Sequence, residues 1–192
     1  LVDSLGADLL KVLLRYNAEG DVELNRRQAE RVAEVSVWCQ EQRIPLMGEI
    51  LVPMTPQQRE QYAARPGDWD AVRRPELTQQ AIQELRAAGA DPSLWKIEGL
   101  DDPAPAEAIV ATARADGRPD VSCVVLGRGE SLDRVEDWLR VAASVDGFVG
   151  FAVGRSLWND EARAAHHGEI SADEARRRVA DKYLRVVQAW RG

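Results

Sequence analysis

Two of the three lysines in this 192-residue sequence lie in apolar stretches, although the chain has 25 basic residues in all. Lys11 lies in ADLLKVLLRY and Lys96 in SLWKIEGL. Lysine is almost never fully buried without a partner. Its presence in such stretches indicates either a buried ion-pair network or an active site in which an amine is the nucleophile.

Charged residues recur on one side of three successive predicted strands. Side chains alternate between the two faces of a strand. On the first strand this puts Lys11 and Arg15 on one face, and on the third it puts Lys96 and Glu98 on one face. Glu49 is the charged residue of the second strand, and on all three strands the opposite face is apolar. In a barrel of parallel strands such charges converge on the end where barrel enzymes carry their active sites. The alternative is an ion-pair network that ties the strands together without catalysis.

The chemistry that suits this set is covalent catalysis through an amine. A neutral Lys96 amine can attack a carbonyl carbon and form a Schiff base, and a nearby cation, Lys11, favours the neutral form. Glu49 or Glu98 would move protons while the carbinolamine loses water. We expect these four side chains to cluster at one end of a parallel sheet, on its concave side, and to act without a metal or a cofactor.

A phosphate site is expected beyond the last two strands, where LGRGES and VGRSLW each place Gly-Arg before a helix. Glycine lets backbone amides approach a ligand, and a helix N-terminus attracts phosphate. The loops after the last two strands form the usual phosphate site of barrel enzymes. Gly127, Arg128, Gly154 and Arg155, with Arg15, are therefore the predicted substrate-binding residues. The alternative is a plain strand-to-helix turn at each position.

The elements that must position these residues alternate along the chain. Strands are expected over 7–16, 45–53, 93–100, 121–127 and 147–154, and helices over 23–43, 74–89, 104–117, 131–144, 156–168 and 171–190. Such alternation predicts an α/β fold with a parallel sheet covered by helices. Residues 52–77 are expected to form one long irregular insertion, of the kind that is often functional.

Five strand–helix units are three short of a closed (β/α)8 TIM barrel. We expect residues 1–192 to form a single barrel domain, of which this chain supplies the C-terminal five units while the N-terminal units are missing. An open α/β sheet with both faces covered is the alternative, but it offers no place where the charged strand positions would meet.

Composition narrows the class of partner. The net charge of −7 and the lack of a basic stripe argue against nucleic-acid binding. No apolar run approaches the roughly 20 residues of a membrane span, and the first residues lack a signal-peptide pattern. Cys39 and Cys123 fit no metal or redox spacing and are expected to be reduced, buried thiols of a cytoplasmic protein. The adjacent His166 and His167 are expected at the surface rather than as metal ligands.

A family resemblance is carried by GADLLKVLLRYN, LMGEILVP, LWKIEGL, VVLGRG and GFAVGRSLW, in this order. These stretches resemble the 2-deoxy-5-keto-D-gluconate 6-phosphate aldolase domain fused behind 5-dehydro-2-deoxygluconokinases of inositol catabolism. More distantly, they are similar to class I tagatose-1,6-bisphosphate aldolases. The resemblance runs from about Gly6 to Trp190.

The resemblance implies roles for individual residues. Lys96 would be the Schiff-base lysine on a sixth strand, Lys11 a second active-site lysine on a fourth strand, and Glu49 the acid of the strand between them. Gly154 and Arg155 match the phosphate-binding end of an eighth strand. Two features depart from the pattern: the first three strands and the kinase half are absent, and VVLGRG has Gly-Arg-Gly where tagatose-type enzymes are richer in serine and alanine.

The implied activity is that of a metal-independent lyase. Retro-aldol cleavage of a phosphorylated keto sugar acid would give dihydroxyacetone phosphate and malonate semialdehyde. The alternatives are a non-catalytic sugar-phosphate-binding barrel domain that supports a sugar kinase, or a different lyase or isomerase on the same barrel. The expected partners are a small-molecule sugar phosphate, a fused or associated sugar kinase and further copies of the chain, with neither nucleic acid nor membrane among them.

Overall fold

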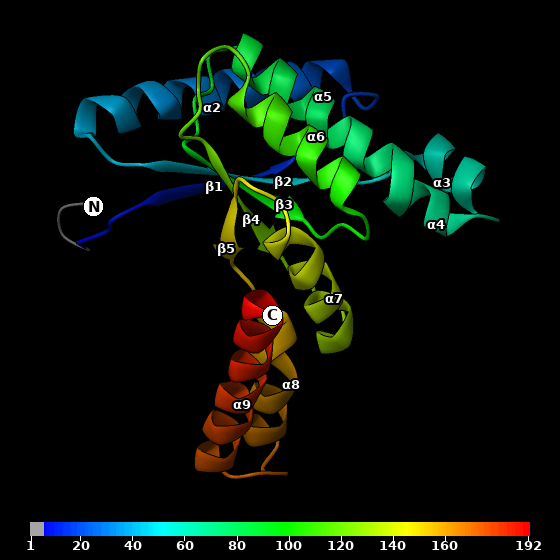
Figure 1. Ribbon diagram of the computed structural model, residues 1–192, viewed down its shortest axis with the longest axis vertical. Coiled ribbons are helices and arrows are strands. Elements are labelled where there is room, and N and C mark those ends of the chain that lie inside the picture. Colours follow the sequence, from blue (N-terminus) through cyan, green and yellow to red (C-terminus); the bar gives the residue numbers. More distant parts are fainter. Residues whose placement is uncertain (1–5) are drawn as a thin grey trace.

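The computed structural model describes residues 6–192 and shows one sheet of five strands (Figure 1). The strands are β1 (Leu10–Arg15), β2 (Leu46–Leu51), β3 (Leu94–Glu98), β4 (Ser122–Leu126) and β5 (Phe148–Phe151). Each lies inside an expected apolar run, neighbours in the sheet are neighbours in the chain, and every neighbouring pair is parallel. The predicted α/β fold of a partial barrel is confirmed.

Helices follow the strands close to the predicted positions. They are α2 (Val22–Gln42), α5 (Arg74–Ala87), α6 (Pro103–Arg114), α7 (Leu132–Ala143), α8 (Arg155–His166) and α9 (Ala172–Arg191). Figure 1 shows α2, α5 and α6 together over one face of the sheet, whereas α8 and α9 form a hairpin that extends away from it. Asp21, Asp102, Ser131 and Ser171 cap α2, α6, α7 and α9 through their side chains. This satisfies amides that the first turn of a helix leaves free.

The insertion is helical, which corrects the expectation of an irregular loop over residues 52–77. It contains α3 (Pro56–Tyr62), α4 (Pro66–Asp68) and the π-helix η1 (Trp69–Arg73), and η1 continues directly into α5. Thr55 and Gln58 form a capping box at the start of α3. The Tyr62 and buried Trp69 rings meet edge to face at 5.6 Å. Helices this short leave no sustained apolar period in the sequence.

The two faces of the sheet differ as the alternation predicted. Leu14, Ile50 and Trp95 are buried on the side of the helices. Gly48 lies on the same side, where a Cβ atom would stand 2.7 Å from Cζ3 of Trp95. A glycine on β2 therefore makes room for the indole of β3. The other face carries the charged strand residues.

Candidate active site

One glutamate bridges the two strand lysines. Glu49 on β2 is in register with Lys96 on β3 and with Leu13 on β1, and Lys11 lies two residues before Leu13 on the same face. The Lys11 ammonium donates to Glu49 Oε2 at 2.6 Å, and Lys96 Nζ lies 2.9 Å from Glu49 Oε1. The three charges therefore share one face, as the strand parity predicted.

The electrostatics of this trio favour an ionised Glu49. Burial opposes the charge, but hydrogen bonds from Lys11 and Lys96 outweigh it and hold the pKa of Glu49 below its usual value. The Lys11 side chain is 43% exposed, whereas those of Lys96 and Glu49 are 15% and 8% exposed. Lys96 is thus the more deeply placed amine, in contact with an ionised carboxylate.

Glu98 lies two residues beyond Lys96 on β3 but has different partners. Its Oε2 accepts a hydrogen bond from the Val52 amide at 2.9 Å, and its Oε1 lies 3.5 Å from Nη1 of Arg128. The β2–β3 ladder stops at the Glu49–Lys96 level, which leaves the Val52 amide free for this side chain. Burial raises the pKa of Glu98 above its usual value. Glu98 therefore belongs to an arginine cluster, and its catalytic role stays a prediction.

A cavity of about 480 Å³ opens in front of the trio. Its lining includes eight of the nine residues predicted from the sequence, namely Lys11, Arg15, Glu49, Lys96, Gly127, Arg128, Gly154 and Arg155. The ninth, Glu98, is not part of this lining, although its Oε1 lies 3.5 Å from Nη1 of Arg128, which is. The strand lysines and both Gly-Arg pairs thus face one hollow, but only the Gly-Arg pairs follow the carboxyl ends of their strands. Lys11 is the second residue of β1 and Lys96 the middle residue of β3, so the expected clustering of the charged residues at one end of the sheet is corrected.

The α8 end of this cavity has features that suit an anion. No side chain among residues 6–192 caps the first turn of α8, whose N-cap is Gly154. The Ser156 hydroxyl oxygen is buried and has no hydrogen-bond partner in the part of the chain that the structure describes. A Cβ at Gly127 would lie 2.9 Å from Val153 Cγ1 and 3.3 Å from Ser156 Oγ. Sequence reasoning missed Ser156, although a serine directly after Gly-Arg at a helix start was its signal.

Arg128 is less free than Arg155. It has a left-handed backbone with φ of 51°, and its Nη1 lies 2.9 Å from Oδ1 of Asp70. Glu130 lies 3.4 Å from the other terminal nitrogen. Carboxylates thus already surround the Arg128 charge. The role of Arg128 in phosphate binding stays a prediction. Asp70, which sequence reasoning also missed, comes from the insertion.

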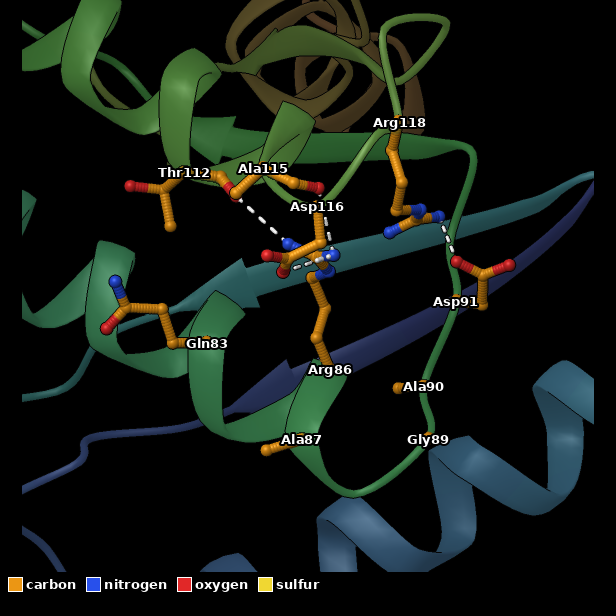
Figure 2. A pocket seen from close by; sticks show the side chains of 10 residues that line it. All are labelled: Gln83, Arg86, Ala87, Gly89, Ala90, Asp91, Thr112, Ala115, Asp116 and Arg118. Atoms are coloured by element: carbon orange, nitrogen blue, oxygen red, sulfur yellow. Dashed lines mark hydrogen bonds and ion pairs between the residues drawn. The ribbon is translucent and has the colours of Figure 1, made fainter.

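A second cavity, of about 540 Å³, is lined by the C-terminal ends of α5 and α6 and by the loops that lead into β3 and β4 (Figure 2). Figure 2 shows Arg86 against the carbonyl of Ala115 and the carboxylate of Asp116, and Arg118 paired with Asp91. Two arginines and two aspartates leave the lining without net charge. These contacts fasten the loops that lead into β3 and β4.

The remaining candidate residues lie apart from the site. Cys39 and Cys123 are free and buried, as expected, and burial raises the pKa of the Cys123 thiol to about 12. His166 and His167 lie at the end of α8 with ring centroids 5.5 Å apart. Within residues 6–192 no three His, Cys, Asp or Glu side chains are grouped to hold a metal ion. No helix of this region is both long and apolar enough to cross a membrane.

Comparison with known proteins places the chain and its fold. Residues 5–192 match the family described as "Uncharacterized protein conserved in bacteria (DUF2090)". The fold is similar to that of fructose-bisphosphate aldolase from Plasmodium falciparum, solved with TRAP and a small-molecule inhibitor, with a TM-score of 0.62 and 17% identity. The match covers 98% of this chain and 56% of the aldolase, so the chain spans little more than half the length of that protein. No curated protein matches the sequence.

Proposed function

We propose that this chain, which belongs to the DUF2090 family, provides the active site of a class I aldolase that cleaves a phosphorylated keto sugar acid. The observation that carries the proposal is the Lys11–Glu49–Lys96 trio on the floor of a cavity that ends at the N-terminus of α8. An amine nucleophile, a base in contact with it and an anion site in one hollow are the parts that a Schiff-base aldolase needs. The aldolase-like fold supports the same function.

The first steps use Lys96 and Glu49. Glu49 Oε1, 2.9 Å from the Lys96 nitrogen, takes a proton, and the free amine adds to the substrate ketone. The carbinolamine formed loses its hydroxyl as water, with the proton returned by Glu49, and a protonated Schiff base remains. The hydrogen bond from Lys11 to Glu49 Oε2 lowers the pKa of that carboxyl and so limits how strongly Glu49 holds a proton.

The cationic Schiff base then acts as an electron sink. A base removes the proton of the substrate β-hydroxyl, the carbon–carbon bond breaks, and its electron pair moves to the Schiff-base nitrogen as an enamine. An aldehyde leaves. Protonation of the enamine carbon and addition of water release the ketone and restore the amine. Glu98, whose raised pKa favours its protonated form, is the second acid near this strand.

The phosphate of the substrate would bind at the start of α8. The uncapped first turn, the buried hydroxyl of Ser156 and the Arg155 guanidinium offer donors and positive charge there. Gly127 keeps the approach open because a side chain would collide with Val153.

The sequence resemblance supplies the finer identity of the substrate. We propose 2-deoxy-5-keto-D-gluconate 6-phosphate, cleaved to dihydroxyacetone phosphate and malonate semialdehyde, with a fused or associated sugar kinase as the source of the phosphorylated compound. The Schiff base would form at the ketone carbon next to the phosphate-bearing carbon.

Borohydride trapping tests the proposal. The protein is incubated with substrate, reduced, digested and analysed by mass spectrometry; we expect a secondary amine that adds one three-carbon phosphate fragment to the peptide containing Lys96. Lys182, on α9 and paired with Glu161 at 2.7 Å, provides the internal comparison. Phosphate-compound binding without an adduct would favour the non-catalytic alternative, and an adduct only on other lysines would contradict the assignment of Lys96.

A further inference from the structure

Asp70 of the insertion links two arginines beside the active-site strand. Its Oδ1 lies 2.8 Å from Nε of Arg74 and 2.9 Å from Nη1 of Arg128. Arg74 is buried and donates to the carbonyl of Gly99 at 2.8 Å, directly after β3. The Asp70 carboxylate therefore holds two guanidinium groups: that of Arg74, which donates to the end of β3, and that of Arg128, which lines the cavity.

The link reaches Glu98 through Arg128. Nη1 of Arg128, the nitrogen that faces Asp70, also lies 3.5 Å from Glu98 Oε1. Glu98 is two residues from Lys96 on the same face of β3, and its second oxygen is held by the Val52 amide. The Arg128 charge is thus shared between an aspartate in direct contact and a glutamate slightly further away.

The insertion is anchored at its other end, so it can hold this arrangement. The side-chain amide of Asn17, after β1, donates to Gln58 Oε1 at 2.7 Å, and Gln58 donates to Glu19 at 2.6 Å. Arg73 pairs with the same glutamate. The insertion is therefore held both by the segment after β1 and by the residues that follow β3 and β4. The π-helical turn that carries Asp70 is of a type often found at functional sites.

We propose that Asp70 is a positioning residue that acts through Arg128 to keep Glu98 able to hold and release a proton in the reaction. This inference rests on the proposed aldolase function. By engaging Arg128, Asp70 prevents that guanidinium from closing on Glu98 as a full ion pair. A fully paired Glu98 would remain an anion and would be of no use as an acid.

The charges around Glu98 give the direction of the effect. Burial raises the pKa of Glu98, while Arg74 on α5, the Val52 amide and Arg128 before α7 lower it, and Asp70 on η1 raises it. Loss of the Asp70 charge removes one raising contribution and releases Arg128 toward Glu98. Both changes move the pKa of Glu98 in the same direction, downward.

The test compares Asp70→Asn with Asp68→Asn, a matched change in the same insertion. Within residues 6–192, Asp68 forms an ion pair only with the exposed Arg65, at 3.3 Å. The Glu98 carboxyl is titrated by carbon-13 NMR, assigned with Glu98→Gln, and kcat is measured against pH. In Asp70→Asn we expect a lower Glu98 midpoint, a basic limb of kcat displaced to lower pH, and a kcat at neutral pH reduced by about tenfold or more with KM little changed. Asp68→Asn should match the wild type, and Asp70→Glu should restore the midpoint.

A double-mutant cycle tests the route through Arg128. Arg128→Gln should raise the Glu98 midpoint, and Asp70→Asn should lower it less in that background than in the wild type. Equal shifts in both backgrounds, or an unchanged Glu98 midpoint in Asp70→Asn, would overturn the inference. Absence of a borohydride adduct in the wild type would instead overturn the proposed function, and the titration would still decide whether Asp70 controls Glu98.

Discussion

The Lys96 ammonium lies 2.9 Å from a carboxylate oxygen of Glu49, at the same register level of the neighbouring strand. The second oxygen of Glu49 is occupied by Lys11, so two cations share one anion in front of an open cavity. A purely structural network would more readily balance its charges. The two lysines exceed the charge of Glu49 by one, which favours an anionic ligand in the cavity. Whether the Lys96 amine acts as a nucleophile can be tested directly.

Substitution of Lys96 separates nucleophile from charge. Lys96→Arg keeps a cation beside Glu49, but a guanidinium stays protonated and cannot form a Schiff base. We expect Lys96→Arg and Lys96→Met to lose the borohydride adduct and to lower cleavage by a factor on the order of 10³ or more. Lys182→Met on α9 is the control and should keep the adduct on Lys96. Near-normal cleavage by Lys96→Arg would make Lys96 an anion anchor and not the nucleophile.

Glu49 should stabilise the fold at neutral pH and lose that effect in acid. Its folded-state pKa lies below the usual 4.5, so its contribution is present above that value and is lost as the pH falls through the folded pKa. Glu49→Gln leaves two lysines without an anion and should cost about 1–3 kcal/mol at neutral pH. Chemical denaturation measured across pH should show this cost shrinking toward acid. Glu34→Gln, which breaks only an exposed pair with Arg31, should not reproduce that trend.

Glu98 should show the opposite dependence. Its folded-state pKa is raised, so the folded protein binds more protons than the unfolded chain above the usual 4.5, and its effect on stability becomes less favourable as the pH rises toward the folded value. The free energy of unfolding of Glu98→Gln relative to wild type should therefore increase over this interval. The same denaturation series measures it. Parallel trends for Glu49→Gln and Glu98→Gln would show that the two carboxylates do not differ as described.

The parts that could be predicted from the sequence are those governed by alternation along single strands. Lys11, Glu49 and Lys96 were placed on one face because each strand carries a continuous apolar face on its other side. The partner of Glu98 could not be found in this way, because it depends on where the ladder between β2 and β3 ends.

The insertion shows a second limit. Its short helices carry no long apolar period, and the position of Asp70 depends on the burial of Trp69 and on two arginines from distant parts of the chain. Such tertiary contacts, and not local propensity, decide that an aspartate of this segment joins Arg74 to Arg128.

Packing behind the site gives a prediction independent of its chemistry. Gly48 lies on the helix-covered face of β2, and an added Cβ would stand 2.7 Å and 2.8 Å from two ring carbons of Trp95. Because Trp95 is fully buried, Gly48→Ala should displace the indole and destabilise the protein by about 1–3 kcal/mol. Denaturation and tryptophan fluorescence measure the two effects. Gly67→Ala, where an added Cβ meets nothing within 4 Å, should show neither.

The phosphate end of the cavity can be tested with one arginine at each end of the same helix. Arg155 begins α8 and lines the cavity, whereas Arg163 lies in the last turn of α8. If the start of α8 binds the substrate phosphate, Arg155→Gln should raise KM by about tenfold, because it removes a charge-assisted hydrogen bond to the phosphate. The same change should affect kcat much less. Arg163→Gln should leave both unchanged. Inorganic phosphate should compete with the substrate in the wild type and in Arg163→Gln, and only weakly in Arg155→Gln, because the helix terminus and Ser156 remain but the formal positive charge is gone. Equal competition in all three proteins would place the phosphate elsewhere in the cavity and would leave the uncapped start of α8 without a ligand.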